Sequence, residues 1–133
     1  MKIIKPALLK EGDTIGILAP SGPMEDDTNL LRAVKFFGNK GYKIKLSDNV
    51  YKKNRYLAGT DVERLDALHN MFADKSVNAI ICLRGGYGAI RLINKINYDL
   101  IKENPKIFCG YSDITALNAM FLKRSGLVTY SGP

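Results

Sequence analysis

Ser112 is the side chain in this sequence that is best placed for covalent chemistry. It follows Gly110 and Tyr111 at the end of a short apolar run, and a helical pattern begins just after it. In an α/β enzyme, a serine at a strand-to-helix turn is lifted clear of the sheet, and the helix N-terminus supplies free N–H groups for a developing oxyanion. This position therefore predicts a nucleophilic serine.

The same residues also fit a purely structural role. Serine and aspartate are common helix N-caps, so Ser112 or Asp113 could serve only to begin the following helix. The stretch also lacks the second glycine of the Gly-x-Ser-x-Gly elbow. The local sequence by itself leaves both interpretations open.

The base that would activate Ser112 is not evident in this chain. A serine nucleophile needs an adjacent general base. The only histidine is His69, which lies in the middle of an amphipathic helical pattern and is expected to have a packing or surface role. We therefore expect the base to come from outside this polypeptide. With no second histidine and no metal-ligand spacing, we expect neither a metal nor a cofactor.

A second candidate site is the glycine-rich segment Arg-Gly-Gly-Tyr-Gly at residues 84–88, directly after an apolar run. Its glycines would let backbone N–H groups approach a ligand closely, and Arg84 could bind a carboxylate or phosphate through two hydrogen bonds. A tight turn that is merely rich in glycine is the alternative. The segment is neither the dinucleotide-binding fingerprint nor a P-loop. Residues 19–23, Ala-Pro-Ser-Gly-Pro, are a rigid turn that could wall a pocket or form a simple loop.

Short apolar runs alternate with amphipathic helical segments along the chain. Strands are expected at residues 14–19, 42–46, 77–83, 106–109 and 127–130. Helices are expected to begin at Asp26 or Asp27 and at Thr60 or Asp61, and to cover residues 86–93, 98–103 and 115–124. This order predicts one α/β domain over residues 1–133, with a mainly parallel sheet and helices on both faces.

The candidate residues are expected to meet at one edge of that sheet. Ligands of parallel α/β sheets bind beyond the carboxyl ends of the strands. Three loops fall at this edge, at residues 20–23, 84–88 and 110–113. Their convergence is the main reason, from the residues alone, to place a site there.

The composition is that of an ordinary globular domain with a basic surplus. Of 133 residues, 46% are hydrophobic and 25% charged, and 20 basic against 13 acidic side chains give a net charge of +7. Most of the surplus lies between Lys35 and Arg55, where a solvated edge is the simplest interpretation. An anionic ligand is the alternative, but no interleaved aromatics and no motif support nucleic acid as a partner.

The cysteines and the apolar stretches of the sequence indicate the cellular compartment in which the protein is expected. Cys82 and Cys109 both lie in apolar runs, which suits buried thiols in a reducing environment. The N-terminus lacks the apolar core of a signal peptide, and no apolar stretch approaches the roughly 20 residues of a membrane span. We therefore expect a cytoplasmic protein with no membrane contact.

Six segments taken together resemble the LD-carboxypeptidase family of serine peptidases, which includes muramoyl-tetrapeptide carboxypeptidases and microcin C self-immunity peptidases. They occur in family order and span essentially the whole chain, and the set is highly specific. One departure is Asn118, where the family often has a histidine that is not part of the triad. The six segments are LKEGDTIG (9–16), APSGP (19–23), YLAGTD (56–61), RGGYG (84–88), GYSDITAL (110–117) and GLVT (126–129).

The resemblance implies a Rossmann-like or flavodoxin-like N-terminal domain and a Ser–Glu–His triad with Ser112 as the nucleophile. In the family, the glutamate and histidine come from a C-terminal domain that this chain lacks. The chain would then be the N-terminal domain alone, and we expect it to be inactive by itself.

The resemblance also implies roles for the two candidate loops. The oxyanion hole would map to the backbone N–H groups of Asp113 and of the glycine-rich loop, where Gly86 is the assigned donor. Arg84, Gly85 and Tyr87 would contact the substrate, with Arg84 orienting its free carboxylate.

The family reaction hydrolyses an amide bond between an L-configured centre and a C-terminal D-amino acid. In peptidoglycan recycling this reaction removes terminal D-Ala from a murein tetrapeptide, so the expected partner is a small peptide. Homodimers are common in the family. A peptidase that cleaves a peptidyl-nucleotide antibiotic is a second hypothesis, and a non-catalytic α/β module that binds an anion through the Arg84 loop is a third.

Overall fold

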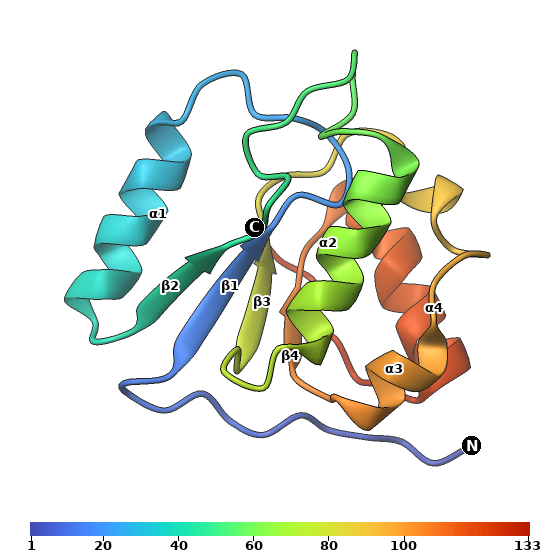
Figure 1. Ribbon diagram of the computed structural model, residues 1–133. Helices are drawn as coiled ribbons and strands as arrows, with labels where there is room; N and C mark the ends of the chain where they lie inside the picture. The colour runs from blue at the N-terminus through green and yellow to red at the C-terminus, as the bar shows by residue number, and fades with distance from the viewer.

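A parallel sheet of four strands forms the centre of the computed structural model, which describes residues 1–133 (Figure 1). The strands are β1 (Thr14–Leu18), β2 (Lys43–Leu46), β3 (Ala79–Cys82) and β4 (Ile107–Cys109). Their spatial order is β2-β1-β3-β4, and every pairing is parallel. The α/β class predicted from the sequence is confirmed.

The fifth strand expected at residues 127–130 forms only isolated bridges. Tyr130 pairs with Cys109 at the outer edge of β4, whereas Leu127 pairs with Ile4 of the N-terminal segment. Because these two residues pair with different segments, no continuous ladder of hydrogen bonds develops. The last residues therefore extend the sheet by a few backbone hydrogen bonds, such as that from the Tyr130 N–H to the Phe108 carbonyl at 2.9 Å, and not by a strand.

Helices cover both faces of the sheet, as predicted, but unequally. α1 (Thr28–Asn39) lies alone on one face, and α2 (Asp61–Ala73), α3 (Tyr98–Glu103) and α4 (Thr115–Ser125) lie on the other (Figure 1). Right-handed crossovers explain this division, because β2 lies on one side of β1 while β3 and β4 lie on the other. None of these helices combines the length and the apolar character that a membrane span requires.

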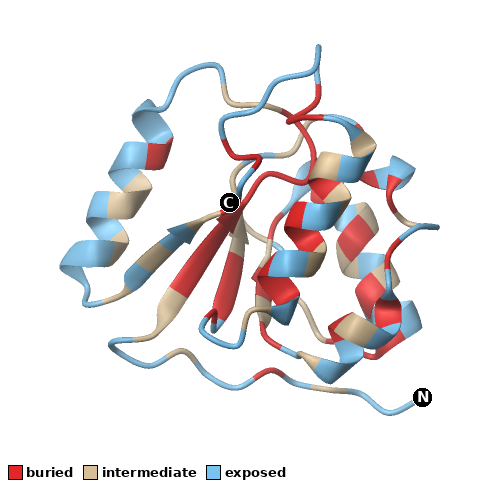
Figure 2. Ribbon diagram, in the orientation of Figure 1, coloured by how far each residue is buried: buried red, intermediate tan, exposed pale blue.

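The larger hydrophobic core lies between the sheet and the three helices α2, α3 and α4. It contains 17 buried residues. In Figure 2 the red of buried residues appears on the strands and on the helix faces turned toward them. Phe72, Phe108 and Phe121 pack ring against ring at its centre, with centroids 4.9 to 5.8 Å apart. Such aromatic pairs each contribute about 0.5–1.5 kcal/mol beyond their buried area. A smaller cluster of three buried residues lies beneath α1.

α2 is fixed against the sheet by two local features. A β-carbon at Gly16 of β1 would lie 2.4 Å from the sulfur of Met71, so the glycine leaves room for the Met71 side chain of this helix against the strand. At its start, the Glu63 N–H donates to Thr60 Oγ1 at 3.1 Å, and the Thr60 N–H donates to the Glu63 carboxylate at 3.0 Å. Of the two predicted caps, Thr60 is therefore the one used, in a capping box.

The start of α1 also differs in detail from expectation. Asp27 occupies the N-cap position but makes no side-chain capping bond. Asp26 Oδ1 instead accepts a hydrogen bond from the Thr28 N–H at 2.9 Å. The neighbouring aspartate thus supplies the acceptor for the first turn.

The prediction of a helix at residues 86–93 is wrong, because only a short 3-10 turn, Ala89–Arg91, forms there. Gly86 and Gly88 have φ angles of +120° and +108°, in the left-handed region where a right-handed helix cannot propagate. The backbone of this loop therefore runs along the carboxyl edge of the sheet and does not form helical hydrogen bonds until Ala89.

His69 has the packing role expected for it. Its Nε2 accepts a hydrogen bond from the Asn97 N–H at 3.0 Å, which ties α2 to the N-cap of α3. Burial lowers the pKa of His69, while the nearby Asp66 opposes the shift. The imidazole is therefore favoured in its neutral form, with Nε2 as the acceptor.

This hydrogen bond predicts a pH-dependent stability. Because the folded-state pKa of His69 lies below its unfolded value, the contribution is fully present above about pH 6.5 and is lost as the pH falls through the folded pKa. We expect the free energy of unfolding to fall by less than about 1 kcal/mol, the worth of one hydrogen bond, because the half-buried ring is partly screened by solvent. In His69→Gln an amide oxygen can accept the same bond without titrating, so urea titrations of both proteins from pH 7.5 to 5 should diverge. Parallel curves would contradict the assignment.

Candidate active site

Three loops meet at the carboxyl edge of the sheet, as predicted. The Gly22 N–H in the first loop donates to the Gly85 carbonyl in the glycine-rich loop at 2.9 Å. Gly85 in turn lies against the nucleophile turn, because a β-carbon placed on it would come within 3.1 Å of Ser112 Oγ. Residues far apart in the sequence are thereby brought into direct contact around one serine.

Ser112 sits at a strained and exposed corner. Its φ angle is +61°, and Arg55 is the only other non-glycine residue with a positive φ. For an L-residue this conformation costs roughly 1–2 kcal/mol. The residue is exposed, and a 3-10 turn at Ser112–Ile114 leads from it directly into α4. A non-glycine residue held in this state at a sheet edge is typical of a functional position.

The interpretation of Ser112 and Asp113 as helix caps is wrong. The N-cap position of the 3-10 turn is Tyr111, and that of α4 is Ile114. Neither helix has a side-chain capping hydrogen bond. The Ser112 hydroxyl is therefore not used to begin a helix.

Backbone groups of the nucleophile turn and of the glycine-rich loop lie close to the serine. The Asp113 N–H donates no hydrogen bond within the chain. It lies 3.3 Å from the position that a β-carbon on Gly85 would occupy. Gly86 comes next and packs against Gly22, whose Cα would lie 3.2 Å from a β-carbon on Gly86. The assignment of Asp113 and Gly86 as the two oxyanion donors stays a prediction.

Arg84 and Tyr87 lie on the same loop but make other contacts. The exposed Arg84 donates from Nη1 to the Pro23 carbonyl at 2.9 Å, and no acidic side chain pairs with it. Tyr87 is 75% exposed, and its ring meets that of Tyr56 edge-to-face, with centroids 6.3 Å apart. Both side chains are open to a ligand at this edge, and their role in substrate binding remains a prediction.

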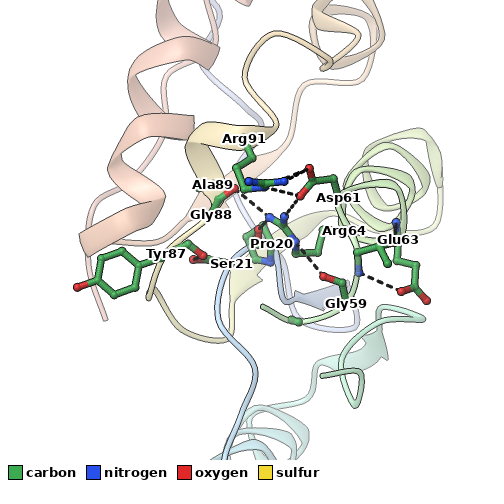
Figure 3. Close-up of polar contacts among 12 residues, drawn as sticks. Pro20, Ser21, Gly59, Asp61, Glu63, Arg64, Tyr87, Gly88, Ala89 and Arg91 are labelled. Carbon is green, nitrogen blue, oxygen red and sulfur yellow. Dashed lines mark hydrogen bonds and ion pairs between the residues drawn. The ribbon is translucent and has the colours of Figure 1, made fainter. Parts of the chain in front are cut away.

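Arg64 is a residue of this region that the sequence interpretation missed. Its side chain is fully buried, and Nη1 donates to the carbonyls of Pro20 and Gly88 at 3.0 Å each. Nε donates to the Gly59 carbonyl at 3.4 Å, and Nη2 pairs with Asp61 (Figure 3). A single guanidinium therefore holds three loops together beneath the site.

Two further contacts support the same arrangement. Asp61 accepts hydrogen bonds from Arg91 at 2.9 to 3.1 Å, which links the start of α2 to the 3-10 turn (Figure 3). The buried Asn49 donates to the Ala19 carbonyl at 2.7 Å and to the Ala58 carbonyl at 2.9 Å. These bonds fix the first loop and the segment before α2 from below.

The positive charges of Arg64 and Arg91 and the negative charge of Asp61 lie in direct contact and compensate one another. Burial lowers the pKa of the Arg64 guanidinium, and Asp61 opposes that shift, so the arginine remains a cation. The hydrogen bond from Arg91 holds the pKa of Asp61 below its usual range. Burial raises the pKa of Cys82 and of Cys109, so neither thiol is an activated nucleophile. No group of three or more His, Cys, Asp or Glu side chains comes together as a metal site.

Comparison with known sequences gives a consistent result. Residues 15–132 match the model of the LD-carboxypeptidase N-terminal domain. A protein of Bacillus subtilis named probable murein peptide carboxypeptidase is 44% identical over 97% of this chain. The microcin C7 self-immunity protein MccF of Escherichia coli is 35% identical over 96% of the chain. The chain spans only 40% of the first relative and 38% of the second.

Solved structures share the same fold. The crystal structure of an MccF-like protein from Bacillus anthracis matches with a TM-score of 0.94 and 41% identity, over 98% of this chain and 40% of that one. A complex of MccF with aspartyl sulfamoyl adenosine matches with a TM-score of 0.92 and 35% identity, over 96% and 39% of the two chains. Another MccF structure is of an active-site mutant in which a serine, an asparagine and a lysine are replaced by alanine.

Proposed function

The chain belongs to the LD-carboxypeptidase family, and from this premise we propose that it is the nucleophile-bearing domain of a serine carboxypeptidase. The proposed reaction is hydrolysis of an amide bond between an L-configured centre and a C-terminal D-amino acid. The proposed substrate is a murein tetrapeptide, from which terminal D-Ala is released. The relative named as a murein peptide carboxypeptidase supports this substrate class.

The geometry around Ser112 is the observation that carries the proposal. The serine is exposed at a φ of +61°, with Gly85 against its side chain and the Asp113 N–H unpaired beside it. Such an arrangement presents a hydroxyl to a carbonyl carbon and donors to the oxygen that becomes negative. The active-site mutant of MccF, in which a serine is replaced, supports the same chemistry.

We assign the glutamate and histidine of the triad to a C-terminal domain beyond this chain. Inside the chain, the sole histidine is His69, whose Nε2 is already bonded to the Asn97 N–H. The curated relatives extend well beyond the part that this chain matches, which is compatible with such a domain. The domain of 133 residues alone is then expected to be close to inactive.

The proposed reaction proceeds in two steps. Ser112 Oγ forms a bond to the substrate carbonyl carbon while its proton passes to the histidine, and the Asp113 N–H stabilises the oxyanion. The amide C–N bond then breaks, the amine of D-Ala leaves with that proton, and an ester to Ser112 remains. Water attacks the ester, which releases the shortened peptide and restores the hydroxyl. Each oxyanion donor contributes about 3 kcal/mol in known cases.

A peptidyl-nucleotide antibiotic is the second candidate substrate. The observation that favours it is the likeness to MccF, a microcin self-immunity protein solved in complex with aspartyl sulfamoyl adenosine. Ser112 would attack a carbonyl carbon in the same way for either substrate. The two candidates therefore differ in the part that leaves and not in the role of this domain.

A direct assay separates these candidates. The full-length protein is incubated with an L,D-tetrapeptide, with the same peptide ending in L-Ala, and with aspartyl sulfamoyl adenosine, and the released amino acid is measured by chiral chromatography. We expect D-Ala release from the first peptide only, and no turnover by the isolated 133-residue domain. Cleavage of the nucleoside alone would favour the second candidate. No turnover of any of them would contradict a peptidase, and turnover by the isolated domain would contradict the assignment of the base.

A further inference from the structure

The carboxylate of Asp113 connects all three loops of the site. Its Oδ2 accepts a hydrogen bond from the Ala89 N–H at 3.0 Å and another from the Ser21 hydroxyl. Ser21 is fully buried in the first loop, and Ala89 begins the 3-10 turn after the glycine-rich loop. A single oxygen next to Ser112 is thus bonded to both other loops.

The Ser21 hydroxyl has a choice of acceptors. Its Oγ also lies 3.0 Å from the Tyr87 carbonyl oxygen, but a hydroxyl has only one proton to donate. An ionised carboxylate is the stronger acceptor of the two, because charge-assisted hydrogen bonds are about twice as strong as neutral ones. The bond to Asp113 is therefore the one that fixes the buried hydroxyl.

The hydrogen bonds to the Asp113 carboxylate restrain the backbone next to the nucleophile. Asp113 directly follows the strained Ser112, and such strain persists only where the surroundings over-determine the conformation. The Asp113 N–H belongs to the peptide plane between the two residues, so anchoring its side chain also restricts the direction of that donor. A misplacement of about 1 Å can cost roughly 100-fold in rate.

The negative charge of the carboxylate does not oppose the oxyanion directly. Oδ2 faces the Ala89 N–H and the Ser21 hydroxyl. The buried guanidinium of Arg64 also attracts Asp113 electrostatically. The two hydrogen-bond donors and the Arg64 guanidinium therefore compensate the negative charge of the carboxylate on the side that faces the loops.

On the basis of the proposed hydrolase function, we propose that the Asp113 carboxylate is a positioning residue. It holds Ser112 and the Asp113 N–H in the geometry needed for attack by accepting hydrogen bonds from Ser21 and Ala89. This role is separate from the oxyanion role of the backbone, which any residue at this position would retain.

The test compares four variants of the full-length protein, Asp113→Ala, Asp113→Asn, Ser21→Ala and Asp27→Ala. Asp27 is an exposed aspartate whose side chain makes no capping bond, so its replacement is the matched control. For each variant we measure the rate of Ser112 labelling by a fluorophosphonate, kcat and KM for D-Ala release, and the urea midpoint of unfolding. The labelling rate measures the reactivity of the Ser112 hydroxyl and does not require the natural substrate.

We expect Asp113→Ala to lower both the labelling rate and kcat by about 10- to 100-fold, with KM changed less than about 3-fold. Asp113→Asn keeps an oxygen that can accept the bond from the Ala89 N–H but loses the charge that favours the bond from Ser21, so its losses should be clearly smaller than those of Asp113→Ala. Ser21→Ala should fall between these two, and Asp27→Ala should match wild type.

Three results would overturn the inference. These are unchanged labelling and turnover in Asp113→Ala, an equal loss in Asp113→Asn and Asp113→Ala, or a lowered urea midpoint with unchanged rates. If the wild type is labelled at Ser112 but releases no D-Ala, the proposed substrate is wrong, and the labelling rates still decide the role of Asp113. If the wild type is neither labelled nor active, the proposed function and this inference are both overturned.

Discussion

Replacing Ser112 by alanine is expected to lower kcat for D-Ala release by at least about 10⁴-fold in the full-length protein. The substitution removes the oxygen that we propose forms the acyl-enzyme, while the proposed oxyanion donors and the loops remain. Alanine keeps the β-carbon, so the strain at a φ of +61° also remains and the free energy of unfolding should change little. Steady-state kinetics and urea titrations measure the two effects separately.

Ser112→Gly is the matched control for this prediction. It also lacks the hydroxyl and should be equally inactive. Because glycine is unstrained at this φ, it should be more stable than Ser112→Ala by up to about 1 kcal/mol. Retained turnover in either variant would show that another group performs the attack.

Replacing Arg64 by methionine is expected to lower the free energy of unfolding by about 3–5 kcal/mol. Methionine fills a similar volume but leaves Asp61 and the carbonyls of Pro20, Gly59 and Gly88 without their buried donor. Unpaired buried polar groups are costly because they have lost water without gaining a partner. The loss should appear in guanidinium unfolding of the full-length protein, together with a lower kcat, because the first loop and the glycine-rich loop lose their common anchor.

Two further substitutions serve as comparisons for the loss of stability expected in Arg64→Met. Arg64→Lys keeps the charge but lacks the planar fork that reaches several acceptors, so about 1–3 kcal/mol should still be lost. Arg91→Met removes the exposed partner of Asp61 and should cost much less than Arg64→Met, because solvent screens exposed ion pairs. If Arg64→Met were no worse than Arg91→Met, the buried network would not be the anchor that we infer.

The fold was predictable where local pattern and topology agree. The apolar run at residues 77–83 contains β3, and the alternation of strands and helices predicted the parallel sheet. A parallel sheet brings the carboxyl ends of its strands to one edge, so the meeting of the loops at Gly22, Gly85 and Ser112 followed from topology. No long-range contact had to be known for this inference.

Arg64 shows why the rest of the site was not predictable. The buried residues of α2 recur at helical spacing, and Arg64 extends their stripe by one turn toward the start of the helix. The position of Arg64 on the apolar stripe could have indicated that its side chain is buried. A charged side chain, however, is usually taken to be exposed to solvent. Its acceptors come from loops far apart in the sequence, so only the folded chain brings them to one guanidinium.

The expected helix at residues 86–93 failed for a different reason. The apolar residues around Ala89 recur at a spacing that suits a helix, but the glycines before them adopt left-handed φ angles. Because glycine permits both hands of the backbone, the choice depends on contacts with Gly22 and Leu57 that the sequence does not display.

Covalent labelling decides whether Ser112 is the nucleophile. The full-length protein is treated with a fluorophosphonate, and the adduct is located by intact mass and peptide mapping, with Ser112→Ala as the control. We expect a single adduct on Ser112, loss of peptidase activity in proportion to labelling, and no adduct in the control. An adduct on another residue, or full activity with Ser112 completely labelled, would contradict this role of Ser112.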